Sequence, residues 1–107
     1  MELQTILNLI NQRKFEEAKN ELIELSSQKN NYKNIYFILS QVCTQLNELK
    51  NSKNYLLKHL KINPKDTEGF LNLGNLHLRT QEPKKAEKTY KKIIKIDSNN
   101  IKALINL

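Results

Sequence analysis

The sequence has little glycine, proline, cysteine and tryptophan, and each shortage excludes a class of protein. Its 107 residues include two glycines, two prolines, one cysteine and no tryptophan. So little glycine and proline excludes collagen-like and Pro/Gly-rich disordered chains. A single cysteine excludes a disulfide framework and a cysteine-ligated zinc finger. No apolar run approaches the roughly 18 residues of a membrane-spanning helix, and the amino-terminal stretch lacks a secretory signal. We therefore expect a soluble, cytoplasmic protein with no membrane partner.

The charge is strongly positive but comes almost entirely from lysine. The formal net charge is +7, and only two of the 18 basic residues are arginines. The densest basic cluster lies within residues 83–96 and consists of Lys84, Lys85, Lys88, Lys91, Lys92 and Lys95. A nucleic-acid binder would interleave arginines and stacking aromatics with such a cluster. We therefore expect a solvated face, and keep binding of nucleic acid or of an acidic partner as an alternative function.

The chain repeats itself with a period of 34 residues. Residues 33–66 align with residues 67–100 without a gap, with six identities and many matches of residue class. The identical pairs are Leu39 and Leu73, Glu48 and Glu82, Lys50 and Lys84, Lys58 and Lys92, Lys61 and Lys95, and Ile62 and Ile96. A repeat of this length predicts a solenoid of stacked supersecondary units.

Each copy contains two segments with helical periodicity. In residues 67–80 and 83–96, apolar residues recur at three- and four-residue steps, which is the period of an amphipathic helix. Pro83 suits the first position of a helix, and Asp66 and Asn100 are expected to cap the first helix of their copies. Turn-forming residues separate the segments. Each copy is therefore predicted to be a helix–turn–helix hairpin, here called helix A followed by helix B.

The two ends of the chain fit the repeat less well. Residues 1–32 resemble a degraded copy whose helix B aligns, while Leu3, Ile6, Leu7 and Ile10 of its helix A are out of register by one residue. This offset predicts a one-residue deletion in the turn near Gln12 and Arg13. Residues 101–107 begin a further helix A that is not completed. We expect a single domain over residues 1–107 that is the amino-terminal fragment of a longer protein, or one whose uncapped last hairpin self-associates.

The pattern resembles the tetratricopeptide repeat, a helical hairpin that recurs about every 34 residues. Its best copy, 67–100, has the large residue at Phe70, the Leu73-Gly74 pair, and a small and an aromatic residue in helix B at Ala86 and Tyr90. The resemblance implies an all-α, right-handed superhelix in which helices A line the concave surface. It also implies that small residues such as Gly74, facing Ala86, let the two helices approach closely.

No residue pattern points to catalysis, a metal or a cofactor. Cys43 occupies a packing position, where a free cysteine acts as a small buried hydrophobe. His59 and His77 belong to different helix types, and neither lies in a cluster with metal-ligand spacing. The sequence has no phosphate-binding loop and no nucleophile elbow. We therefore expect a non-enzymatic chain without a cofactor.

The concave surface implied by the resemblance is the expected binding site for a peptide or helix of a protein partner. Its candidate residues are Asn34, Phe37, Ile38, Gln41, Gln45, Glu68, Leu71, Asn72, Asn75, Arg79 and Asn106. Amide side chains both donate and accept, so they suit a peptide backbone. Asn72 and Asn106 resemble two rungs of the asparagine ladder of O-linked N-acetylglucosamine transferases.

The family's carboxylate clamp for chaperone peptides is not expected, because its positions hold Leu3, Leu7, Ile38, Glu68 and Asn72. Glu68 would repel a carboxylate. The predicted function is a non-catalytic protein-interaction scaffold. The alternatives are the substrate-recruiting region of a larger enzyme, such as a glycosyltransferase or sulfotransferase, and the basic binding surface described above.

Overall fold

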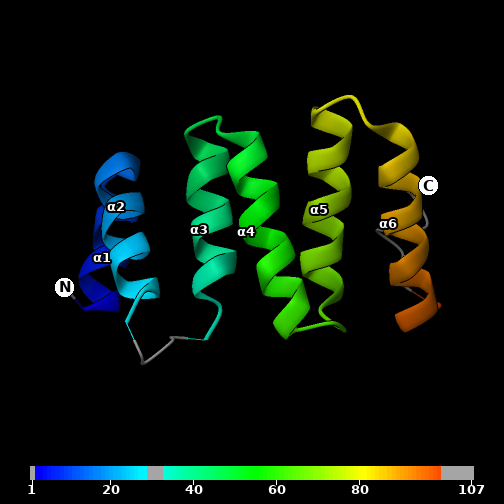
Figure 1. The fold of residues 1–107 in the computed structure, drawn as a ribbon, viewed down its shortest axis with the longest axis horizontal. Helices are drawn as coiled ribbons and strands as arrows, with labels where there is room; N and C mark the ends of the chain where they lie inside the picture. Colours follow the sequence, from blue (N-terminus) through cyan, green and yellow to red (C-terminus); the bar gives the residue numbers. More distant parts are fainter. Residues whose placement is uncertain (1, 29–32, 100–107) are drawn as a thin grey trace. The chain divides into compact units, whose positions relative to one another are not determined.

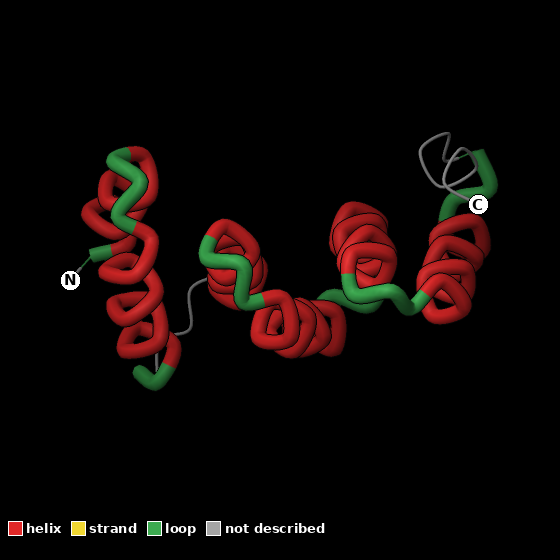
Figure 2. Tube along the Cα trace, turned by 90° about the horizontal axis from the view of Figure 1, so that it is seen from above, coloured by secondary structure: helices red, strands yellow, loops and turns green. Residues whose placement is uncertain are grey.

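The computed structural model describes residues 2–28 and 33–99, and in these ranges it contains helices and no strand (Figures 1 and 2). The helices are α1 (Leu3–Asn11), α2 (Phe15–Ser26), α3 (Ile35–Gln45), α4 (Leu49–Ile62), α5 (Thr67–Arg79) and α6 (Pro83–Ile96). They form three hairpins with short turns, α1–α2, α3–α4 and α5–α6. The predicted all-α fold of helix–turn–helix hairpins is confirmed.

The turns inside the three hairpins have the same backbone geometry at intervals of 34 residues. Arg13, Asn47 and Gln81 adopt positive φ angles of 61°, 60° and 61°. In each turn the next residue's amide donates to a carbonyl five residues earlier. These bonds are Lys14 N to Leu9 O at 2.9 Å, Glu48 N to Cys43 O at 2.8 Å, and Glu82 N to His77 O at 2.8 Å.

This regularity shows that the predicted deletion near Gln12 and Arg13 is wrong. The first turn is in register with the other two, so the difference lies in which positions of α1 carry the apolar residues. Ile6 is fully buried, and it stands 34 residues before Ser40 and 68 residues before Gly74. A large side chain therefore occupies the register position where the later copies have small ones.

The chain divides into two compact units, residues 1–59 and 60–107, and α4 contains the boundary. In the first unit, α2 packs against both α1 and α3. The buried core of this unit consists of Ile6, Ala18, Leu22, Leu25, Ile35, Leu39 and Val42. Partly buried aromatic and aliphatic side chains, including Phe15, Tyr36 and Tyr55, surround it. The apolar faces of these helices are thus packed against neighbouring helices, as expected for amphipathic helices.

In the second unit α5 packs against α6. Its buried core comprises Ala86, Tyr90 and Ile93, with Phe70 and Leu71 partly buried against them. Tyr90 is only 1% exposed, so α6 contributes its largest side chain to the middle of this hairpin.

Small residues mark the closest approach of the helices within a hairpin, as predicted. A Cβ atom added at Gly74 would lie 2.8 Å from Cζ and 2.9 Å from Cδ1 of Tyr90. The three atoms nearest to such a Cβ all belong to the Tyr90 ring, whereas the sequence had suggested Ala86. In the preceding copy, the buried hydroxyls of Ser40 and Ser52 are hydrogen-bonded at 2.8 Å.

The expected helix starts are partly correct. Pro83 is the first residue of α6, where its missing N–H costs nothing. Asp66 stands at the N-cap of α5, but its side chain makes no capping hydrogen bond. Asn100 lies outside the described residues. No helix in residues 2–28 or 33–99 has the length and apolarity needed to cross a membrane.

Candidate functional site

The predicted site residues of α3 follow one helical stripe, but only some of them are exposed. Asn34, Gln41 and Gln45 are exposed, and Phe37 and Ile38 are half-buried. Ile38 packs against the core of the first unit. The ring of Phe37 lies 5.2 Å from the ring of His59 on α4, centroid to centroid, with an interplanar angle of 57°.

Exposed amides are therefore the main polar groups that α3 offers to a ligand. Within the part of the chain that the structure describes, Gln41 and Gln45 make no side-chain hydrogen bond. Thr44, between them on the same face, is committed internally. Its hydroxyl donates to the Ser40 carbonyl at 3.0 Å and lies 2.7 Å from the Ser52 hydroxyl. Two glutamines, with the half-buried Phe37 edge beside them, make a surface suited to amide hydrogen bonding.

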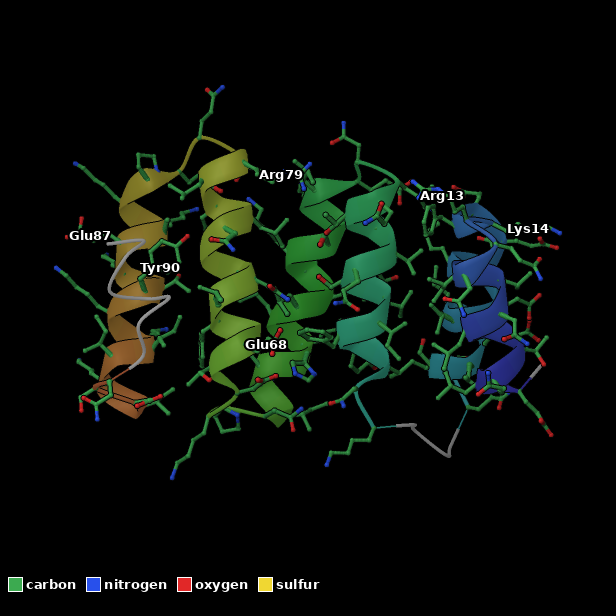
Figure 3. The ribbon with its side chains drawn as sticks, turned by 180° about the vertical axis from the view of Figure 1, so that it is seen from behind. Arg13, Lys14, Glu68, Arg79, Glu87 and Tyr90 are labelled. Carbon is green, nitrogen blue, oxygen red and sulfur yellow. The ribbon has the colours of Figure 1, made fainter. Side chains whose placement is uncertain are left out.

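The predicted site residues of α5 form a longer row. Glu68, Asn75 and Arg79 are exposed, and Leu71 and Asn72 are half-buried. Glu68 and Arg79 lie near opposite ends of the helix (Figure 3), so the row has a negative end and a positive end. Leu78, beside this row, is 48% exposed. The α5 surface thus combines charge, amide groups and aliphatic area.

A hydrogen bond fixes the orientation of Asn75. The Tyr90 hydroxyl of α6 donates to Asn75 Oδ1 at 2.5 Å. Burial raises the pKa of Tyr90, so this hydroxyl remains protonated at neutral pH and keeps its donor role. The Oδ1 atom of Asn75 is therefore engaged, and its Nδ2 group is the part left to donate to a ligand.

The last member of the predicted set, Asn106, lies outside the described residues. The proposed asparagine ladder therefore has one described rung, Asn72. The structure describes the other ten predicted residues, five on α3 or at its N-cap and five on α5. Leu71 has a second role that the sequence did not indicate, because it packs against the core of the second unit.

Three lysine–aromatic contacts were not predicted from the sequence. In the first unit, Tyr36 and Tyr55 stack with centroids 6.4 Å apart and an interplanar angle of 13°. Lys58 Nζ lies 5.5 Å from the Tyr36 ring centroid and 5.6 Å from that of Tyr55. In the second unit, Lys92 Nζ lies 5.9 Å from the ring centroid of Phe70. These are cation–π distances, and they explain why lysine recurs at positions 58 and 92.

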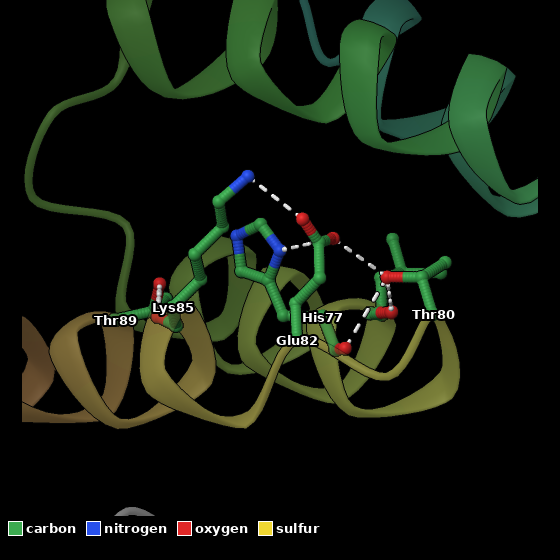
Figure 4. Close-up of polar contacts among 6 residues, drawn as sticks. His77, Thr80, Glu82, Lys85 and Thr89 are labelled. Carbon is green, nitrogen blue, oxygen red and sulfur yellow. Dashed lines mark hydrogen bonds and ion pairs between the residues drawn. The ribbon is translucent and has the colours of Figure 1, made fainter.

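The glutamate that precedes helix B also has a structural role in both units. Glu82 accepts hydrogen bonds from the Thr80 hydroxyl at 2.8 Å and from Lys85 Nζ at 2.7 Å, and His77 Nδ1 lies 3.4 Å away (Figure 4). Its counterpart Glu48 accepts from Lys19 Nζ at 3.0 and 3.1 Å.

The ion pair of Lys19 with Glu48, assisted by Glu16, raises the pKa of Lys19. A group with a raised folded pKa contributes stability that is present below its unfolded pKa and lost as the pH rises through the folded value. This link is therefore intact at neutral pH. It fastens α2 to the start of α4 within the first unit.

The environments of Cys43 and of the possible metal ligands fit a structural role. Cys43 is fully buried, and burial raises the pKa of its thiol to about 11. A thiol in this state is a poor nucleophile at neutral pH. Among residues 2–28 and 33–99, no three His, Cys, Asp or Glu side chains are grouped to hold a metal ion.

Repeated helical hairpins with a period of 34 residues define a class of helical repeat proteins. The model of the tetratricopeptide repeat family matches residues 33–66 and 67–100. The chain belongs to this family. No curated protein sequence matches it.

Solved structures with the same fold are similar to this chain at low sequence identity. A tetratricopeptide repeat protein from Parabacteroides merdae has a TM-score of 0.84 at 22% identity, over 92% of this chain and 38% of that one. MamA has a TM-score of 0.85 at 19% identity, over 97% of this chain and 61% of MamA. The first TPR of Spaghetti (RPAP3), bound to an HSP90 peptide, has a TM-score of 0.82 at 15% identity, over 97% and 82%. The chain thus spans less than two thirds of the first two structures.

Proposed function

We propose that this chain is a non-catalytic protein-interaction scaffold. It binds a peptide or a helix of a partner protein through the exposed face of α5, and the exposed face of α3 is a second candidate surface of its own. Family membership supports this role, since a family relative, the first TPR of Spaghetti, is bound to a peptide. The observation that carries the proposal is the row on α5, where Asn72, Asn75 and Arg79 offer polar groups beside partly exposed Leu71 and Leu78.

The chemistry of these faces favours an uncharged peptide backbone over a terminal carboxylate. Gln41 and Gln45 supply amides that both donate and accept, and Asn75 supplies a donor whose orientation is fixed by Tyr90. Glu68 places a negative charge on the same face of α5. A peptide of the HSP90 type, which ends in a carboxylate, is therefore expected to bind poorly.

The repeat organisation is part of the same proposal. We propose that residues 1–32 are a divergent first repeat and that residues 101–107 begin a fourth. The 34-residue spacing of the turns at Arg13, Asn47 and Gln81 supports the first assignment. A divergent first repeat leaves α3 and α5 as the helices A with matched binding positions.

A clean test uses polar side chains of α5 that lie outside the hydrophobic core of the second unit. Peptides that bind the whole chain are selected from a displayed random library, and one is then titrated against three proteins. The α5 variant combines Asn72→Ala with Arg79→Ala. The control variant combines Asn54→Ala with Lys61→Ala, which removes the same kinds of group from exposed positions on α4.

The α5 variant should weaken binding about tenfold, as expected when two polar contacts of about 0.7 kcal/mol each are lost, and the control should bind like the wild type. Circular dichroism should show unchanged helicity for both. Equal affinity of the selected peptide for the wild type and the α5 variant would place the binding site elsewhere. Failure to enrich any peptide would contradict the scaffold role itself.

A further inference from the structure

The exposed side of α6 carries a straight row of lysines that the proposed function does not use. Lys84, Lys88, Lys91 and Lys95 are spaced four, three and four residues apart, and all are exposed. On an α-helix this spacing keeps the four side chains on one narrow stripe, with rises of about 6, 4.5 and 6 Å between them. The core residues Ala86, Tyr90 and Ile93 lie on the opposite side of the helix.

Little within the described part of the chain neutralises this row. Lys91 Nζ is 3.0 Å from Glu87 Oε1, one turn earlier. Lys84, Lys88 and Lys95 have no ion-pair or hydrogen-bond partner there. Glu87 is the one acidic residue of α6, against six lysines. Like charges at three- and four-residue spacing destabilise a helix, so an anionic partner would relieve a cost that the free chain bears.

The row belongs to α6 and is not a general property of helix B. The corresponding positions of α4 hold two lysines, an asparagine and an exposed leucine, and those of α2 hold a single charge, which is negative. In order these are Lys50, Asn54, Leu57 and Lys61 on α4, and Glu16, Asn20 and Ile23 on α2, with Ser27 at its C-cap.

We propose that this row, here called the α6 lysine stripe, binds an acidic α-helix of a protein partner. A partner helix laid along α6 would present carboxylates at the same four-three-four spacing, so that each lysine meets one of them. The stripe is distinct from the α3 and α5 faces, and its partner is recognised by charge.

Nucleic acid fits the stripe less well. The aromatic residues of the α5–α6 hairpin are engaged in packing, because Tyr90 is 1% exposed and Phe70 is partly buried against the core, with Lys92 Nζ 5.9 Å from its ring centroid. No arginine occurs on α6, so the bidentate guanidinium contacts common in nucleic-acid recognition are absent from this helix. What the stripe offers is a line of point charges, which suits carboxylates on a helix of equal pitch.

The test titrates the full chain at low salt with three probes. The first is a synthetic alanine-rich helical peptide with four glutamates at the four-three-four spacing. The second is its isomer with the same glutamates distributed around the helix. The third is an oligothymidylate of equal charge. The stripe variant combines Lys88→Gln with Lys95→Gln, and the control combines Lys50→Gln with Lys61→Gln, so both lose the same net charge.

The wild type should bind the striped peptide about fivefold more tightly than its isomer. The stripe variant should bind the striped peptide about fivefold more weakly than the wild type does, as expected for the loss of two exposed ion pairs. The control should change affinity less than about twofold. Equal losses in both variants, or equal affinity for the two peptides, would reduce the effect to net charge and overturn the proposal. Tighter binding of the oligothymidylate than of the striped peptide would also overturn it, in favour of nucleic acid. Binding through the α3 and α5 faces is tested separately, because those residues are unchanged.

Discussion

The contact between Gly74 and Tyr90 allows a sharp prediction about what holds the α5–α6 hairpin together. Replacing Gly74 with alanine would place a methyl group within 2.9 Å of the Tyr90 ring atoms Cζ and Cδ1. Such a distance is not tolerated, so the ring or the backbone must move. The ring has little freedom, because it is buried and its hydroxyl is bound to Asn75.

Two effects of opposite sign decide the result of Gly74→Ala. Alanine is favoured over glycine inside a helix by about 0.5–1 kcal/mol. Forcing an extra methyl group into a well-packed core costs about 1–3 kcal/mol. We expect the second effect to win, for a net destabilisation of about 1–2 kcal/mol. For a domain of this size, that lowers the melting temperature by roughly 5–10 °C.

Thermal and urea unfolding, followed by circular dichroism, would measure this loss, and Gly69→Ala is its control. A Cβ at Gly69 would meet Leu60 Cδ2 at 2.9 Å and Asp66 Oδ2 at 3.1 Å. Both atoms are the ends of flexible side chains, so they can move away at little cost. Gly69→Ala is therefore expected to be neutral or to stabilise the chain by up to about 1 kcal/mol, the gain in helix propensity.

A second substitution tests whether the Tyr90 ring is the cause of the destabilisation by Gly74→Ala. In a Tyr90→Leu background the space beside position 74 is larger, so Gly74→Ala should become neutral or stabilising by about 0.5–1 kcal/mol. The change of sign corresponds to a coupling energy of about 1.5–3 kcal/mol between the two sites. If Gly74→Ala stabilises the wild-type chain, or destabilises it equally in both backgrounds, then the ring contact is not what requires glycine.

Three further predictions concern residues outside this contact. Cys43 should resist maleimide labelling at pH 8 until the chain unfolds, and rapid labelling of the folded chain would contradict its burial. Because the pKa of the thiol is raised to about 11 in the folded chain, its contribution to stability should fall as the pH rises from about 9 towards about 11. Lys92→Met keeps the aliphatic stem but removes the cation above Phe70, so it should cost about 0.5 kcal/mol in urea unfolding, while Lys95→Met should cost nothing. Glu82→Ala should cost about 1 kcal/mol through its lost charge-assisted hydrogen bonds, with a smaller loss at high salt, and a salt-independent loss would refute the electrostatic explanation.

The fold could be predicted from the sequence because its signals are local and repeated. The 34-residue offset aligned Leu39 with Leu73, and the three- and four-residue apolar steps separated helices A from helices B. Pro83 marked the start of a helix by its own covalent structure. Each of these features depends on the residue and its near neighbours, so no knowledge of the tertiary arrangement was needed.

The register of the first hairpin could not be predicted in the same way. Apolar residues were taken to mark fixed positions, so the one-residue offset of Ile6 suggested a deleted residue in the turn. The turn geometry is set by backbone hydrogen bonds and by the positive φ of Arg13. Arginine gives no sequence signal for that conformation, which glycine and asparagine usually adopt. The core accommodated the change in side-chain size while the backbone kept its period.

The candidate site was predictable only as a set of positions. Helical phase selected the faces of α3 and α5, but it could not tell which side chains are already engaged. Thr44 is hydrogen-bonded to Ser52, 8 positions away, and Asn75 to Tyr90, 15 positions away, in each case between the two helices of a hairpin. Such bonds depend on the crossing of two helices, which the spacing of residues along one helix does not specify.

The sizes of the side chains at two register positions, those of Gly74 and Tyr90, change together from one hairpin to the next. At the same two register positions, the three hairpins hold Ile6 with Leu22, Ser40 with Leu56, and Gly74 with Tyr90, and all six residues are buried. The residue on helix A becomes smaller along the chain, and the largest residue on helix B accompanies the smallest one on helix A. A close-packed interior requires the total volume to be filled and leaves open which helix supplies it. These two positions can therefore change together while the φ angle of the turn residue repeats to within a degree, even though the copies at 33–66 and 67–100 share six identities in 34 positions.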